Sequence, residues 1–111
     1  MDIFLVGLNY QTASIELRER VYLNNDALCS ALTGLQHLHS TAQDNLHVLD
    51  EVVILSTCNR MEVYGVCDNI NIAAEATITY LADRTNVSAI ELKKAIYIKQ
   101  GVTAIEQLFR V

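Results

Sequence analysis

The feature that most constrains the fold is a pair of apolar segments with only a short connection between them. Residues 52–55 have the sequence Val-Val-Ile-Leu, and residues 61–66 have the sequence Met-Glu-Val-Tyr-Gly-Val. β-branched and aromatic residues favour strands, and a continuous apolar run is typical of a buried strand. Two strands joined only by Ser56–Arg60 form a hairpin. The sequence therefore predicts a buried strand, a tight turn and a second strand.

Other strands and helices are expected on both sides of this hairpin. Residues 3–8 are apolar and predict a strand, and residues 95–99 contain Ile-Tyr-Ile and predict a last one. Apolar residues at helical spacing predict helices from the polar cluster at 24–26 to about residue 39, and over 70–81. Helical turns are expected within 13–22, and a loop is expected over 40–50. A short helix is expected from Ser88 to Lys94, with Glu91 in a capping box. A last helix is expected to start at Thr103 and to be still running at Val111.

The order of the main elements is strand, helix, strand, strand, helix, strand. This order is typical of the split βαβ arrangement. We therefore predict an α+β fold, a ferredoxin-like βαββαβ antiparallel sheet with helices on one face. Because this fold carries many unrelated functions, function has to be argued from individual residues.

Composition limits the class of protein. The chain has 111 residues, of which 51% are apolar and 19% charged, so one folded domain is expected. Its net charge of −5 argues against nucleic-acid binding through a broad basic face. No apolar run is long enough to span a bilayer and no basic signal-peptide region opens the chain, so a cytoplasmic location is expected. No Gly-x-Gly-x-x-Gly motif occurs, so no dinucleotide site is predicted within this chain.

The segment Ser56–Arg60 has the strongest chemical signal. Cys58 lies between small polar residues, and Arg60 follows two positions later. A nearby cation favours the thiolate, which is the nucleophilic form of cysteine. Arg60 can instead bind a substrate carboxylate through two parallel hydrogen bonds. The simpler interpretation is a buried structural cysteine beside a surface arginine, and these residues alone leave both interpretations open.

The other cysteines and the charged segments give weaker signals. Cys29 lies in an apolar helix and Cys67 shares a strand face with Val63, so both are expected to be packing residues. Three widely spaced cysteines match neither a disulfide framework nor a zinc site, so reduced thiols are expected. Residues 16–20 are expected to form a solvated helical face. Three histidines are expected at a solvated helix end and in the polar loop, and no metal site is predicted: His37, His39 and His47.

Segments along the whole chain resemble glutamyl-tRNA reductase. Residues 7–13 (Gly-Leu-Asn-Tyr-Gln-Thr-Ala) and 15–19 (Ile-Glu-Leu-Arg-Glu) resemble the opening of that family. Residues 54–64 (Ile-Leu-Ser-Thr-Cys-Asn-Arg-Met-Glu-Val-Tyr) resemble its catalytic signature, and residues 104–111 resemble the stretch before its next motif. The resemblance implies that residues 1–111 are the N-terminal catalytic, substrate-binding domain, truncated, without the NADPH-binding and dimerisation domains.

The resemblance implies an NADPH-dependent enzyme of tetrapyrrole (porphyrin) biosynthesis. Its family reduces glutamyl-tRNA to glutamate-1-semialdehyde, the first step of the five-carbon route. Cys58 is implied to attack the activated carbonyl, displace the tRNA and leave a thioester that hydride then reduces. Because the NADPH domain is absent, the fragment alone is expected not to catalyse the reduction. The implied partners are glutamyl-tRNA(Glu), a second subunit bound through an absent C-terminal domain, and glutamate-1-semialdehyde aminomutase. The implied substrate-binding residues are Thr57, Cys58, Asn59 and Arg60.

The sequence departs from the family at three positions. The family usually has histidine where Tyr10 stands, and commonly also at Lys99. Gln107 occupies the place of a histidine thought important for activity, and glutamine cannot transfer a proton. The alternative to an enzyme is a non-catalytic ferredoxin-like module that binds a ligand or another protein. Selective alkylation of Cys58 that substrate prevents would distinguish the enzyme from such a module.

Overall fold

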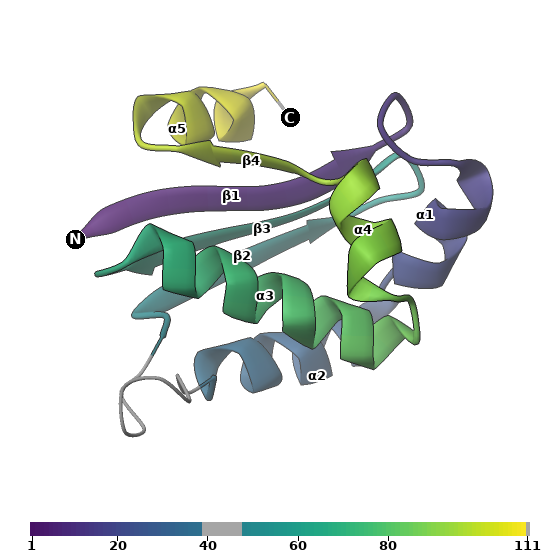
Figure 1. Cartoon of the computed structure of the whole chain (residues 1–111), viewed down its shortest axis with the longest axis horizontal. Helices are drawn as coiled ribbons and strands as arrows, with labels where there is room; N and C mark the ends of the chain where they lie inside the picture. Colours follow the sequence, from purple (N-terminus) through teal and green to yellow (C-terminus); the bar gives the residue numbers. More distant parts are fainter. Residues whose placement is uncertain (39–47, 111) are drawn as a thin grey trace.

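The computed structural model describes residues 1–38 and 48–110, which form an antiparallel sheet covered by helices (Figure 1). Neighbouring strands in the sheet follow the order β2-β3-β1-β4, and every neighbouring pair is antiparallel. The predicted α+β, ferredoxin-like arrangement is therefore confirmed. The strands are β1 (Asp2–Asn9), β2 (Glu51–Ser56), β3 (Arg60–Cys67) and β4 (Tyr97–Gln100).

Most helices begin where a side chain caps the backbone. The side chains of Ser14, Asn24, Asn69 and Ser88 each accept a hydrogen bond from the N–H three residues on. Two helices end earlier than predicted, at residues 36 and 109. Within the described residues, no helix is both long and apolar enough to cross a bilayer. The helices are α1 (Ile15–Val21), α2 (Asn25–Gln36), α3 (Ile70–Thr85), α4 (Ala89–Ala95) and α5 (Val102–Phe109).

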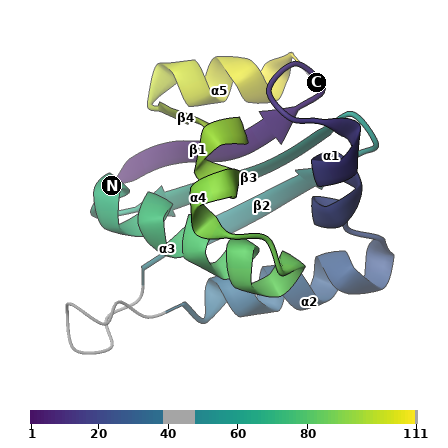
Figure 2. The same ribbon diagram turned by 45° about the vertical axis from the view of Figure 1, so that its right-hand side comes forward.

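The two faces of the sheet are covered by different helices. On one face, Phe4 of β1 and Met61 of β3 belong to the main core, to which α1, α2, α3 and α4 contribute. On the other face, Ala104 of α5 packs against Leu5 and Tyr64. Figures 1 and 2 show α5 across the sheet from α2 and α3. The prediction of helices on one face is therefore wrong for α5, because both alternating sets of strand residues need cover.

Strand β2 is less buried than its sequence predicts. It lies at an edge of the sheet, where Ile54 is 9% exposed but Val53 is 57% exposed. Helix α5 contacts β1 and β4, and β3 lies between these two strands and β2. The prediction of a buried strand is therefore wrong for the Val53 face, because a local apolar run does not reveal whether a strand is central or at an edge. The predicted loop at 40–50 lies outside the described residues, except for 48–50.

Candidate active site

The turn between β2 and β3 holds Cys58 on a well-defined backbone. The N–H of Thr57 donates to the carbonyl oxygen of Arg60 at 2.7 Å. The Thr57 hydroxyl oxygen accepts hydrogen bonds from the N–H groups of Asn59 at 3.3 Å and Arg60 at 3.2 Å. A threonine hydroxyl bound to the following backbone stabilises a tight turn. Thr57 therefore shapes the turn, on which the side chains of Cys58 and Asn59 are exposed.

Helix α1 lies beside this turn, as Figures 1 and 2 both show. Nη1 of Arg18 donates to the carbonyl oxygen of Cys58 at 3.3 Å. Nε of Arg18 is buried and has no hydrogen-bond partner among the described residues. Arg18 is only partly exposed, so the prediction that it belongs to a solvated face is wrong. The helix and the turn enclose a pocket of about 370 Å³, lined by Ile15, Arg18, Glu19, Tyr22, Cys58 and Asn59.

On the α5 side of the sheet, a buried carboxylate gathers donors from three elements. The side chain of Glu62 is fully buried. Its Oε1 accepts from the Tyr64 hydroxyl at 2.9 Å and from Nη1 of Arg60 at 3.3 Å. Its Oε2 accepts from the Tyr97 hydroxyl at 2.6 Å and from Nε2 of Gln107 at 3.1 Å. A buried charge is tolerated when it is paired and hydrogen-bonded, as it is in this Glu62 cluster.

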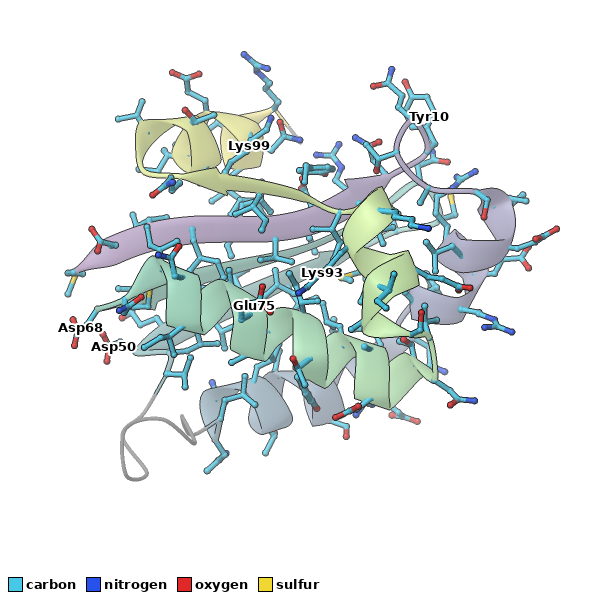
Figure 3. The ribbon with its side chains drawn as sticks, in the orientation of Figure 1. Tyr10, Asp50, Asp68, Glu75, Lys93 and Lys99 are labelled. Atoms are coloured by element: carbon cyan, nitrogen blue, oxygen red, sulfur yellow. The ribbon has the colours of Figure 1, made fainter. Side chains whose placement is uncertain are left out.

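Two of the three positions that were expected to differ from the resembled family, Lys99 and Gln107, meet at this cluster. Nζ of Lys99, labelled in Figure 3, donates to Oε1 of Gln107 at 3.1 Å. The Gln107 amide therefore bridges the Lys99 cation on β4 and the buried Glu62 carboxylate on β3. Tyr10, the third departure, is 60% exposed in the loop after β1. Gln107 acts here as a hydrogen-bonding link between two charges, a role that needs no proton transfer.

The two tyrosines of the cluster are held in their protonated form. Burial raises the pKa of Tyr64 and of Tyr97 well above the ordinary value of 10.0. The hydrogen bond and the negative charge of Glu62 raise both pKa values further, while the charge of Arg60 opposes them. An ionised phenol beside a buried carboxylate is unfavourable because like charges repel where water is excluded. Both phenols therefore remain hydrogen-bond donors to Glu62 at neutral pH.

The other two cysteines have different environments. Cys67 is buried in the main core, which confirms its packing role. Burial raises the pKa of the Cys67 thiol, and the nearby charges of Asp2, Asp50 and Asp68 raise it further. Cys29 is exposed on α2, so its predicted packing role is wrong. The buried side of that helix instead carries Ala31 and Leu35.

The histidines and metal ligands are only partly covered by the structure. Nδ1 of His37 donates to the carbonyl oxygen of Thr33 at 2.8 Å, at the end of α2. His39 and His47 lie outside the described residues. In residues 1–38 and 48–110, no group of three or more side chains suited to metal binding comes together. The absence of a metal site from the whole chain stays a prediction.

Sequence reasoning missed Arg18, Glu62 and Tyr97 as residues near the candidate site. Glu62 had a usable signal, since an acidic residue inside an otherwise apolar strand has to be paired if it is buried. Arg18 had none, because its charged neighbours on α1 are exposed and it resembles them. Tyr97 reaches Glu62 only because β4 and β3 both pair with β1, a fact of topology rather than of local sequence.

Together, these features define an α+β domain of ferredoxin-like topology that presents a thiol on a hairpin turn. A family model described as the N-terminal domain of glutamyl-tRNAGlu reductase matches residues 6–111. The glutamyl-tRNA reductase of Brevibacillus brevis is 43% identical over 111 residues, covering 100% of this chain and 23% of that protein. That of Pseudoalteromonas atlantica is 39% identical and is covered over 24% of its length. The chain belongs to the glutamyl-tRNA reductase N-terminal domain family and spans about a quarter of the length of these relatives.

A solved structure agrees with this fold. Glutamyl-tRNA reductase from Methanopyrus kandleri superposes with a TM-score of 0.56 and 24% sequence identity. The match covers 98% of this chain and 21% of that chain. At this identity, the likeness supports the α+β fold alone.

Proposed function

We propose that this chain performs the acyl-transfer step of glutamyl-tRNA reduction, with Cys58 as the nucleophile. The Cys58 thiolate attacks the carbonyl carbon of the glutamyl ester and forms a carbon–sulfur bond. The carbon–oxygen bond to the tRNA ribose breaks, and the ribose oxygen takes up the proton that the thiol lost. The product is a glutamyl thioester on Cys58, and no redox change occurs in this step. Sulfur suits it because a thiolate both attacks and leaves well.

The observation that carries this proposal is an exposed thiol on a turn whose backbone is held from two sides. Thr57 binds the turn from within, and Arg18 binds the Cys58 carbonyl oxygen from α1. A positioned nucleophile lowers the barrier because its orientation is set before the reaction. Residues 54–64 around Cys58 are the segment that resembles the family's catalytic signature.

We propose that the Glu62 cluster and Lys99 bind the carboxylate of the glutamyl group. Arg60 and Lys99 bring two positive charges, and Glu62 brings one negative charge, so this region has an excess of positive charge. Arg60 keeps 26% of its side chain exposed and can present its guanidinium to a carboxylate. Asn59 is exposed beside Cys58 and can donate to a substrate oxygen.

The described residues do not fit a nicotinamide dinucleotide. Such a site places a glycine-rich turn between a parallel strand and a helix, whereas the strands described here pair only antiparallel. We therefore assign thioester formation alone to this chain. We propose that NADPH-dependent reduction to glutamate-1-semialdehyde belongs to the whole reductase, acting in the cytoplasm. Its homodimeric state and transfer of product to the aminomutase stay predictions.

The test uses glutamyl-tRNA with isotope-labelled glutamate, followed by acid quenching and peptide mass spectrometry. We expect a glutamyl adduct on Cys58 that hydroxylamine removes, as expected for a thioester. The Cys58→Ser variant should form none. Cys29→Ser, which removes another exposed thiol, should react like the wild type. Tight binding of glutamyl-tRNA without any adduct would instead identify a non-catalytic binding module.

A further inference from the structure

The pocket between α1 and the β2–β3 turn has features that thiol chemistry does not explain. Tyr22 is 50% exposed and Ile15 is 62% exposed, so aromatic and branched apolar surfaces lie open beside Cys58. Exposed apolar surface in a hollow marks a binding site. The exposed apolar surface therefore points to a ligand in this pocket.

The charges on the two sides of the turn differ. The charged residues that line the pocket are Arg18 and Glu19, so its lining has no net charge. The Glu62 cluster with Lys99 has a net positive charge. A carboxylate therefore favours the cluster side, and an uncharged, flat, partly apolar group favours the pocket side. An aminoacyl ester has both kinds of group, one on each side of its reactive carbonyl.

We propose that this pocket binds the 3′-terminal nucleoside of the aminoacyl-tRNA, the group that leaves when Cys58 attacks. The inference rests on the proposed function and names the subsite of its leaving group. The ester bond joins the glutamyl carbonyl directly to the terminal ribose, so a carbonyl held at Cys58 brings that nucleoside next to the thiol. The pocket volume of about 370 Å³ lies within the range of small-ligand sites.

The pocket side chains suit a nucleoside. Single-stranded RNA ends are recognised by stacking of bases on aromatic rings and guanidinium planes. Tyr22 provides the aromatic ring, Ile15 an apolar contact and Arg18 a guanidinium plane. Glu19 provides acceptors for a base amino group or a ribose hydroxyl. Because the bound group is uncharged, this contact needs no broad basic surface, in agreement with the net charge of −5.

The first experiment measures protection of Cys58 by adenosine, the nucleoside at the 3′ end of tRNA. Alkylation by iodoacetamide is followed by mass spectrometry, with Cys29 in the same sample as the reference thiol. We expect adenosine to slow alkylation of Cys58 saturably and to leave Cys29 unchanged. Tyr22→Ala should weaken this protection at least about fivefold, the lower limit for loss of one base–aromatic stack. Tyr10→Ala, which removes an exposed tyrosine outside the pocket, should leave it unchanged.

The second experiment separates this inference from the proposed function. With glutamyl-tRNA as substrate, Tyr22→Ala should raise the half-saturating concentration for thioester formation at least about fivefold and leave the maximal rate nearly unchanged. Circular dichroism checks that the variant is folded. Thioester formation with the same concentration dependence in both proteins, or no adenosine protection of the wild type, would overturn the nucleoside subsite. Failure of the wild type to form any thioester would overturn the proposed function instead.

Discussion

Replacement of Glu62 by glutamine should destabilise the domain far more than an ordinary charge-to-amide substitution. The Glu62 carboxylate accepts four hydrogen bonds, two on each oxygen. Glutamine keeps one acceptor oxygen, but an NH₂ group replaces the other oxygen. This NH₂ group is itself a donor and faces two of the four donor groups. At least one phenol, Tyr64 or Tyr97, therefore loses its acceptor. A hydrogen bond to a charged group contributes about 1.5–3 kcal/mol, and an unpaired buried donor costs about 1–3 kcal/mol.

These two figures describe the same lost hydrogen bond, so the expected loss in the free energy of unfolding is about 1.5–3 kcal/mol, counting the phenol side only. Arg60 is left out of this sum because its side chain is 26% exposed and water can replace the lost partner. Such a loss is a large part of the roughly 5–15 kcal/mol that stabilises a typical domain. The assay is urea unfolding followed by far-ultraviolet circular dichroism.

The matched control is Glu75→Gln. The Glu75 carboxylate on α3 lies 3.1 Å from Nζ of Lys93, and the two side chains, labelled in Figure 3, are 63% and 48% exposed. Loss of such a surface pair should cost less than about 1 kcal/mol. If Glu62→Gln costs no more than this control, the buried carboxylate does not hold β3, β4 and α5 together and the reasoning is refuted.

Two further predictions concern the same face of the sheet. Gly7 lies opposite Glu62, and a Cβ on Gly7 would come within 2.8 Å of Cγ of Glu62. Gly7→Ala should therefore destabilise the domain by about 1–3 kcal/mol through overpacking. Urea unfolding measures this loss, and a variant as stable as the wild type would contradict the prediction. The raised pKa values of Tyr64 and Tyr97 mean that the folded state keeps protons which the unfolded state releases above its ordinary pKa of 10.0. The two protonated phenols therefore contribute fully to the free energy of unfolding below about pH 10, and their contribution is lost as the pH rises above about 10. Between about pH 10 and 12, the wild type should lose stability more steeply than the double Tyr64→Phe, Tyr97→Phe variant. Parallel unfolding free energies over that range would contradict the pKa argument.

The sequence predicted what depends on local order and missed what depends on neighbours across the sheet. The hairpin around Cys58 and the caps at Asn24 and Ser88 follow from residues close together in the chain, and the structure contains them. The exposure of Val53 depends on the position of β2 in the sheet, which a short apolar segment does not encode.

The candidate site shows the same division. Cys58 and its turn were predicted as site residues from a contiguous motif, and Gln107 from the resemblance. The link between Gln107 and Glu62 joins residues 45 positions apart and was not predictable from spacing. The contact of Arg18 with the Cys58 carbonyl spans 40 positions and depends on how α1 lies against the turn.

The edge position of β2 also bears on how this domain behaves in concentrated solution. Within the described residues β2 pairs with β3 alone, so its outer backbone edge is a template on which another extended chain can add a strand. Val53 makes association at that edge more favourable, because its β-branched apolar side chain is exposed to solvent. The carboxylate of Glu51, exposed at the start of the strand, repels an identical copy placed alongside. The hairpin that presents the thiol therefore also carries one of the two sheet edges at which a further strand can add, and the Glu51 charge opposes that addition.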